Sequence, residues 1–191
     1  MTAEAVGNVV WAPDPVKQKH AGYTIEDVLA LPDEAPRVEL SDGVLLVVPS
    51  PSARHQKLNW RLASWLEQHV PDGFEPQMAV GVVVDYTSTL EPDVLILHSP
   101  VDPDHHFFQP EQVAVAVEIV SPGTRKRDRF EKPGIYAAAG IPHFWRIELN
   151  PLHLFVYDLV DGRFELVGDS TDELQLTQPF EVRLPIRELG S

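Results

Sequence analysis

The chain has 191 residues, 43% of them hydrophobic, which is ample for one domain with an ordinary core. Cysteine is absent, so a disulfide framework and a thiolate metal site are excluded. The 29 acidic and 15 basic residues give a formal net charge of -14, which repels polyanions at long range and counts against a nucleic-acid partner.

The ends of the chain bear on location and domain organisation. The first residues lack the basic segment and apolar core of a signal peptide, and no apolar run approaches the roughly 20 residues needed to span a bilayer. We therefore expect a cytoplasmic protein with no membrane partner. Residues 1–22 include Pro13 and Pro15 and few periodic apolar positions, so an extended N-terminal arm is expected there. Residues 23–191 are expected to form a single domain.

Local patterns in the first half predict two helices, a hairpin and a strand. Thr24 and Asp27 have the spacing of a capping box, so a short helix should begin there and stop at Pro32. An Asp-Gly pair at residues 42–43 predicts a hairpin of residues 37–40 and 44–48. Apolar residues recur at helical spacing over residues 52–70, which predicts the longest helix. Residues 74–85 are expected to be one strand.

Two short apolar runs, residues 94–97 and 113–117, are expected to be buried strands. Asp93 precedes the first run and Glu118 follows the second, so their carboxylates would lie side by side if the strands pair. Residues 100–110 are expected to be an irregular loop. Three more strands are expected at residues 143–149, 152–159 and 163–167, joined in part by a turn at residues 161–162.

A second capping box, Asp128 with Glu131, predicts a helix that begins there and ends at Gly140. Lys132 would share a face of this helix with Asp128 and Tyr136, although Pro133 removes one backbone hydrogen bond. The order of elements indicates an α+β fold, with a mixed central sheet flanked by helices.

The acids and the lysine together suit metal-dependent hydrolysis of a phosphodiester. Mg²⁺ and Mn²⁺ prefer oxygen ligands, which Asp93, Glu118 and the carbonyl of Ile119 could supply. Glu39, on a neighbouring strand, could be a further ligand. Lys132 could stabilise the charge of the transition state or orient water. Each residue also has a structural interpretation: Asp93 as a strand cap, and Glu39 and Lys132 as solvated surface groups.

Basic and imidazole groups near these acids are candidates for phosphate binding. Arg125, Arg127 and Arg129 belong to the densest basic cluster in the chain and could bind substrate, although such a run is also typical of a solvated helix start. His55, at a helix start, could contact phosphate or simply pack on the helix. His105 and His106 lack further ligands at zinc spacing and are expected to decorate a loop.

Several motifs together resemble the Uma2 family of putative restriction endonucleases, over residues 23–158. They are Glu39-Leu-Ser-Asp-Gly43, His55, Pro92-Asp-Val94, Val117-Glu-Ile-Val-Ser-Pro122, Arg127-Asp128 with Lys132, and Tyr136-Ala-Ala-Ala-Gly-Ile-Pro142 followed by Phe144-Trp145. The resemblance implies a PD-(D/E)XK nuclease fold in which Asp93 and Glu118 bind metal and Glu39 is an additional acid. Val120 stands where that superfamily has lysine, and the resemblance implies that Lys132 replaces it.

Three functions are compatible with these observations. The first is a Mg²⁺- or Mn²⁺-dependent DNA endonuclease, for which a homodimer would be the simplest way to cut both strands. The second is a catalytically inactive interaction protein that keeps the nuclease fold. The third is a hydrolase of RNA or of a small phosphoester, for which the net charge of -14 matters less.

Overall fold

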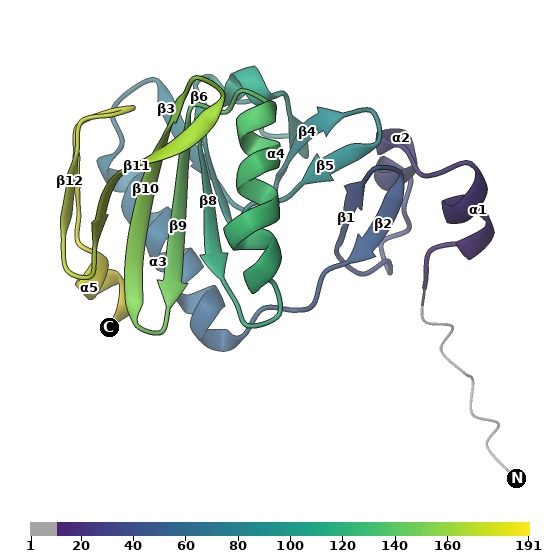
Figure 1. Cartoon of the computed structure of the whole chain (residues 1–191), viewed down its shortest axis with the longest axis horizontal. Coiled ribbons are helices and arrows are strands. Elements are labelled where there is room, and N and C mark those ends of the chain that lie inside the picture. Colours follow the sequence, from purple (N-terminus) through teal and green to yellow (C-terminus); the bar gives the residue numbers. More distant parts are fainter. Residues whose placement is uncertain (1–10) are drawn as a thin grey trace, which may run out of the picture.

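The structure is a computed structural model, and it describes residues 11–191 (Figure 1). The helical elements are α1 Pro15–His20, α2 Ile25–Leu29, α3 Ala53–His69, the 3₁₀-helix η1 Pro110–Gln112, the π-helix η2 Arg127–Glu131, α4 Lys132–Ala138 and α5 Ile186–Gly190. The strands are β1 Val38–Ser41, β2 Val44–Val47, β3 Phe74–Gln77, β4 Gly81–Asp85, β5 Ser88–Leu90, β6 Val94–His98, β7 Phe107–Phe108, β8 Val113–Val120, β9 His143–Leu149, β10 Leu152–Val160, β11 Arg163–Ser170, β12 Leu174–Leu176 and β13 Val182–Leu184.

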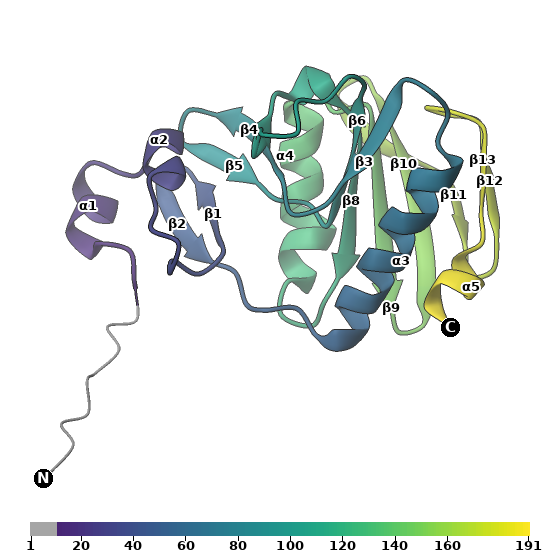
Figure 2. The same cartoon turned by 180° about the vertical axis from the view of Figure 1, so that it is seen from behind.

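A six-stranded mixed sheet forms the centre of the molecule, in the order β11-β10-β9-β8-β6-β3. Its neighbouring strands are antiparallel except for β8 and β9, which are parallel because the helix α4 connects them. The helix α4 covers one face of the sheet, and α3 covers the other with α5 beside it (Figures 1 and 2). Strand β8 is buried along its whole length, which accounts for its nearly continuous apolar sequence.

A second sheet of five strands, in the order β2-β1-β5-β4-β7, lies on the N-terminal side of the first (Figure 1). The β1–β2 hairpin turns at Asp42 and Gly43, whose φ angles of 49° and 77° fit the tight turn expected there. Tyr23, Leu40 and Leu45 form a small core of their own beneath it. This sheet matters for function because β1 carries Glu39 toward the central sheet.

The mixed central sheet flanked by helices confirms the expected fold class. The hairpin, the capping box of Thr24 and the long helix were also predicted correctly, the helix being capped by Ser52. The single domain over residues 23–191 stays a prediction.

Four local expectations were wrong. Residues 74–85 are two strands in different sheets, because the chain turns at Ala79, where φ is 57°. The loop of residues 100–110 includes the short strand β7, which pairs with β4. Within the expected arm, residues 1–10 lie outside the described residues, and Pro15–His20 are helical because Asp14 caps them.

The fourth wrong expectation concerns the helix that carries Lys132. Asp128 is not its cap, because helical structure already begins at Arg125. The hydroxyls of Ser121 and Thr124 bond each other's backbone N–H, which closes the turn before the helix.

Candidate active site

The two predicted strand acids face each other across neighbouring strands. Strands β6 and β8 are antiparallel, with Val94 opposite Val117, so that the next pair in register is Asp93 and Glu118. The backbone N–H of Asp93 donates to the carbonyl of Val117, at 3.0 Å. The backbone N–H of Ile119 in turn donates to Oδ2 of Asp93, at 2.7 Å. The pairing therefore fixes the Asp93 carboxylate against the end of β8, as the sequence predicted.

Lys132 is buried among three carboxylates. Its Nζ lies 2.8 Å from Oε1 of Glu118, 3.0 Å from Oε1 of Glu39 and 3.7 Å from Oδ1 of Asp128. The Lys132 side chain is only 6% exposed. A buried ammonium group is costly unless it is paired, so the three acids and the lysine depend on one another. We call Glu39, Glu118, Asp128 and Lys132 the ionic cluster.

Tyr136 belongs to the same site, although sequence reasoning had placed it only on the face of Lys132. Its hydroxyl donates to Oε1 of Glu118 at 2.6 Å, and the side chain is fully buried. Oε1 of Glu118 therefore accepts from both Tyr136 and Lys132, which fixes the orientation of that carboxylate. The spacing of four residues from Lys132 to Tyr136 was the available sequence signal.

Asp128 is the second residue whose place in the site was missed. Its side chain is buried and accepts a hydrogen bond from the hydroxyl of Thr124, while its Oδ1 has no hydrogen-bond partner among residues 11–191. Its place in the site was not predicted, because an acid three residues before Glu131 has the spacing of a capping box at a helix start.

The π-helix η2 brings Lys132 into place. The backbone N–H of Lys132 donates to the carbonyl of Arg127, five residues earlier, instead of to the residue four positions earlier. Pro133 has no N–H to offer to Arg129 and would crowd that carbonyl in a regular helix. The wider turn accommodates Pro133 while α4 continues to Ala138. The predicted disturbance at Pro133 is thus a π-helical turn.

Glu39 lies in the ionic cluster, and each of its two carboxylate oxygens lies beside a cation. Oε1 lies beside Lys132 and Oε2 beside the guanidinium of Arg127. Burial alone would raise the pKa of Glu39, but these two positive charges lower it overall. Its role as a metal ligand stays a prediction, and direct coordination would require it to leave one of these cations.

His55 braces the other side of the site. Its Nε2 lies 2.9 Å from the carbonyl oxygen of Ile119 and 3.3 Å from Oδ2 of Asp93. Because a carbonyl can only accept, Nε2 carries the proton in this hydrogen bond. Burial lowers the pKa of His55, but Asp93 and the Ile119 carbonyl outweigh it and raise the value. His55 therefore links α3 to two of the predicted ligand residues, Ile119 and Asp93.

Burial dominates the electrostatics of Glu118. It raises the pKa of Glu118 to about 8, against the opposing positive charge of Lys132. Burial would lower the pKa of Lys132, but Glu118 and Glu39 more than offset this and raise it. Burial also raises the pKa of Tyr136 well above its usual value, so the phenol keeps its proton and donates to Glu118. The lysine is charged in this arrangement.

A pocket of about 460 Å³ opens over these groups. It is lined by all four members of the ionic cluster, by Asp93, His55, Ile119 and Arg127, and by the loops before α3 and after β8. The predicted acids, the lysine and the histidine are thus brought to one accessible cavity.

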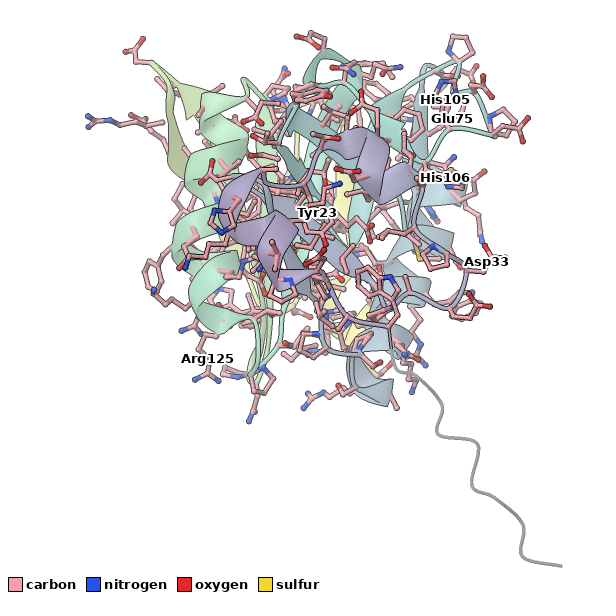
Figure 3. The ribbon with its side chains drawn as sticks, turned by 90° about the vertical axis from the view of Figure 1, so that its right-hand side faces the viewer. Tyr23, Asp33, Glu75, His105, His106 and Arg125 are labelled. Carbon is pink, nitrogen blue, oxygen red and sulfur yellow. The ribbon has the colours of Figure 1, made fainter. Side chains whose placement is uncertain are left out.

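The predicted basic cluster is only partly in the site. Arg127 lines the pocket and pairs with Glu39, whereas Arg129 forms a two-pronged pair with Glu148, with both contacts at 2.8 Å. Arg125 is exposed and lies at the periphery, on the opposite side of the molecule from His105 and His106 (Figure 3). The structure therefore brings one of the three arginines to the pocket.

The donors fit Mg²⁺ or Mn²⁺. Asp93, Glu118 and the Ile119 carbonyl are oxygen donors at one end of the pocket. Within residues 11–191 no group of three or more His, Asp or Glu side chains is already arranged around a metal position. Magnesium needs only one or two carboxylates, because it keeps several waters. The ionic cluster holds three carboxyl groups around Lys132, with Arg127 beside Glu39, and a bound divalent cation would favour the charged form of Glu118, whose pKa burial raises to about 8.

The fold and site define a protein of the restriction-endonuclease-like type. The model of the Uma2 family, described as "Putative restriction endonuclease", matches residues 25–187, and the chain belongs to this family. A solved structure described as a putative nuclease belonging to DUF820, from Anabaena variabilis, is similar at a TM-score of 0.70. The two chains are 19% identical, and the similarity covers 87% of this chain and 97% of the other, which shows a shared fold. No curated protein matches the sequence.

No helix among residues 11–191 is long and apolar enough to cross a membrane.

Proposed function

We propose that this protein is a Mg²⁺- or Mn²⁺-dependent endonuclease that hydrolyses phosphodiester bonds of DNA. The observation that carries the proposal is the register of β6 and β8, which opposes Asp93 to Glu118 beside the buried Lys132. Membership of the Uma2 family supports a nuclease role. A homodimer that cuts both strands and a cytoplasmic location remain predictions from the sequence.

In this proposal Asp93, Glu118 and the Ile119 carbonyl would hold the metal. A bound divalent cation activates water and neutralises charge that develops on the phosphate. Tyr136 holds the Glu118 carboxylate in one orientation through its 2.6 Å hydrogen bond. His55 fixes the Ile119 carbonyl, and Lys132 places a positive charge where the transition state gains negative charge. Glu39 keeps the Lys132 ammonium in the pocket.

The test is isothermal titration of Mg²⁺ and Mn²⁺ into the wild type and Glu118→Gln, with supercoiled plasmid cleavage on the same samples. Glutamine keeps the shape of the side chain but removes its charge, so metal binding and cleavage should both fall to background. Asp93→Asn should behave in the same way. Glu131→Gln is the matched control, because Glu131 is a surface acid next to Lys132 whose side chain is 44% exposed.

The outcomes separate the proposal from its rivals. Cleavage retained by Glu118→Gln would remove Glu118 from the site. Absence of metal binding in the wild type would contradict the proposal and favour an inactive interaction protein. The net charge of -14 favours a second candidate, a hydrolase of RNA or a small phosphoester. Metal binding without DNA cleavage, but with hydrolysis of RNA or of bis(p-nitrophenyl) phosphate, would favour that candidate.

A further inference from the structure

A second pocket of about 220 Å³ adjoins the candidate active site. It is lined by Arg37, Gln56, Asn59, Trp60, Met78, Ala79, Pro92 and Asp93, and we call it the α3 pocket. Arg37 and Asp93 line both pockets, so the two share a wall that includes one of the predicted metal ligands. A molecule held at Asp93 could therefore extend into the α3 pocket.

The helix α3 links the two pockets. His55 faces the active site, and Asn59 lies one helical turn later, about 6 Å along the axis, at 1.5 Å per residue. A phosphate and the base of the same nucleotide are separated by a similar span, that of one sugar. The helix thus places the residue that braces Ile119 and Asp93 one turn before a residue at the position that a base would occupy.

Two apolar side chains in the α3 pocket are exposed. Trp60 is 62% exposed and Met78 is 39% exposed, although burial of either would be favourable. The flat face of an exposed tryptophan binds nucleobases by stacking, and stacking accepts any base because every base has a π-face. Methionine adapts its shape and packs well against aromatic rings.

Asn59 provides a separate observation that points to a ligand. It lines the α3 pocket, and its Oδ1 is buried with no hydrogen-bond partner among residues 11–191. A buried acceptor without a partner costs stability, so its presence calls for an explanation. The exposed amide of Gln56, one turn earlier on the surface, offers a donor and an acceptor that suit the edge of a base, and a small rotation of the Asn59 side chain would bring its Oδ1 to the same edge.

We propose that the α3 pocket is a nucleobase subsite, which holds one unstacked base of a single-stranded segment next to the phosphate at Asp93 and Glu118. This proposal rests on the proposed function, and it narrows the substrate of that function to single-stranded or unpaired nucleic acid. A base in an intact duplex is stacked between its neighbours and does not present its face to Trp60. Stacking on Trp60 therefore requires the base to be free.

The charge of the molecule supports this choice. At a net charge of -14, with Arg127 and Arg129 already paired, contacts to phosphate give little of the affinity. A neutral base is not subject to the same repulsion. Binding that depends on stacking should accordingly respond only weakly to added salt, in contrast to binding that depends on many phosphate contacts.

The test is fluorescence anisotropy with a labelled single-stranded dT oligonucleotide and a duplex of the same length, in EDTA so that nothing is cleaved. Wild type should bind the single strand more tightly than the duplex. Trp60→Ala should weaken single-strand binding about 5-fold to about 150-fold, as expected for one stacked base, and leave duplex binding unchanged. Phe130→Ala is the matched control, because Phe130 is 74% exposed and lines neither pocket.

A second variant tests Asn59. Because its Oδ1 has no partner in the free protein, Asn59→Ala should leave thermal stability unchanged or raise it, while it weakens single-strand binding or changes the preference among homopolymers of different base. If Asn59→Ala bound single strands with the affinity of the wild type and with the same preference among homopolymers, Asn59 would not belong to the subsite.

Failure of the subsite can be told apart from failure of the nuclease proposal. If Trp60→Ala binds as Phe130→Ala does, or if the wild type binds no oligonucleotide, the subsite is overturned even if cleavage of another substrate is found. If binding depends on Trp60 but no metal-dependent cleavage occurs, the subsite stands and the nuclease proposal fails.

Discussion

The two faces of the central sheet differ in what they bury. On the α3 face apolar side chains of the helix and the sheet pack together, among them Leu62 and Leu66 of α3 and Trp145 of β9, all at most 1% exposed. On the α4 face the apolar packing around Phe144 gives way to the ionic cluster at Glu118. Apolar packing stabilises the fold, whereas buried charges are costly and are typical of functional sites. The comparison indicates that the α3 face contributes mainly apolar packing and that the α4 face buries the charged groups of the candidate site.

The largest expected effect is the loss of the buried cation. Lys132→Met would leave Glu39, Glu118 and Asp128 as buried acids without their shared partner. We expect the free energy of unfolding to fall by about 3–5 kcal/mol, together with loss of cleavage. Urea denaturation measures the change. Lys126→Met is the control, because Lys126 is 85% exposed, and its change should stay within about 0.5 kcal/mol. A loss below about 1 kcal/mol for Lys132→Met would mean that the acids do not depend on the lysine.

A truncation on the other face should separate stability from activity. Leu66 is fully buried on α3, and Leu66→Ala should lower the free energy of unfolding by about 2–5 kcal/mol by leaving a cavity. The activity of the folded fraction should be unchanged, because Leu66 lines neither pocket. Denaturation by urea and plasmid cleavage, each at a temperature where the variant is folded, check both parts. Reduced activity of the folded variant would break the distinction between the faces.

A smaller effect is expected from the hydroxyl of Tyr136. Tyr136→Phe removes a hydrogen bond to the buried Glu118, and we expect a loss of about 1–3 kcal/mol, as for a buried acceptor that loses a partner. Metal affinity measured by calorimetry should also fall, because Glu118 loses part of its orientation. Tyr157→Phe serves as the control, since Tyr157 does not line the pocket.

The smallest effect is expected outside the cluster. Arg129 and Glu148 form a well-aligned pair near the surface, and Arg129→Ala should cost no more than about 1 kcal/mol. Single-strand binding should stay unchanged, because Arg129 lines neither pocket. Thermal denaturation and anisotropy measure the two quantities. A marked loss of nucleic-acid binding would restore the predicted role of Arg129 in substrate binding.

The sequence predicted the parts of the site that depend on neighbours in the chain. Asp93 precedes one apolar run and Glu118 follows the other. The two acids therefore become neighbours when these strands pair in antiparallel orientation. Helical spacing put Lys132 on the same helix face as Asp128 and Tyr136. The contacts of Glu39 with Arg127 and of His55 with Ile119 could not be predicted, because each joins elements that are distant in the chain.

Three shortcomings have physical causes. Glu39 was predicted near the site, but its pairing with Arg127 depends on how the second sheet packs against the first. Asp128 was interpreted as a cap, because a buried acid and a capping acid have the same local pattern. Trp60 was not predicted as a site residue. In a helix with an apolar stripe, the sequence does not show whether a further aromatic side chain is exposed or buried.

The separation of Glu118 and Lys132 onto a strand and a helix has an evolutionary consequence. A lysine two residues from its acid on one strand would be fixed by the backbone of that strand. Here its position depends on the π-helical turn between Arg127 and Lys132, which is separate in the chain from β8. Relatives could thus gain or lose the lysine independently of the predicted metal ligands at β6 and β8.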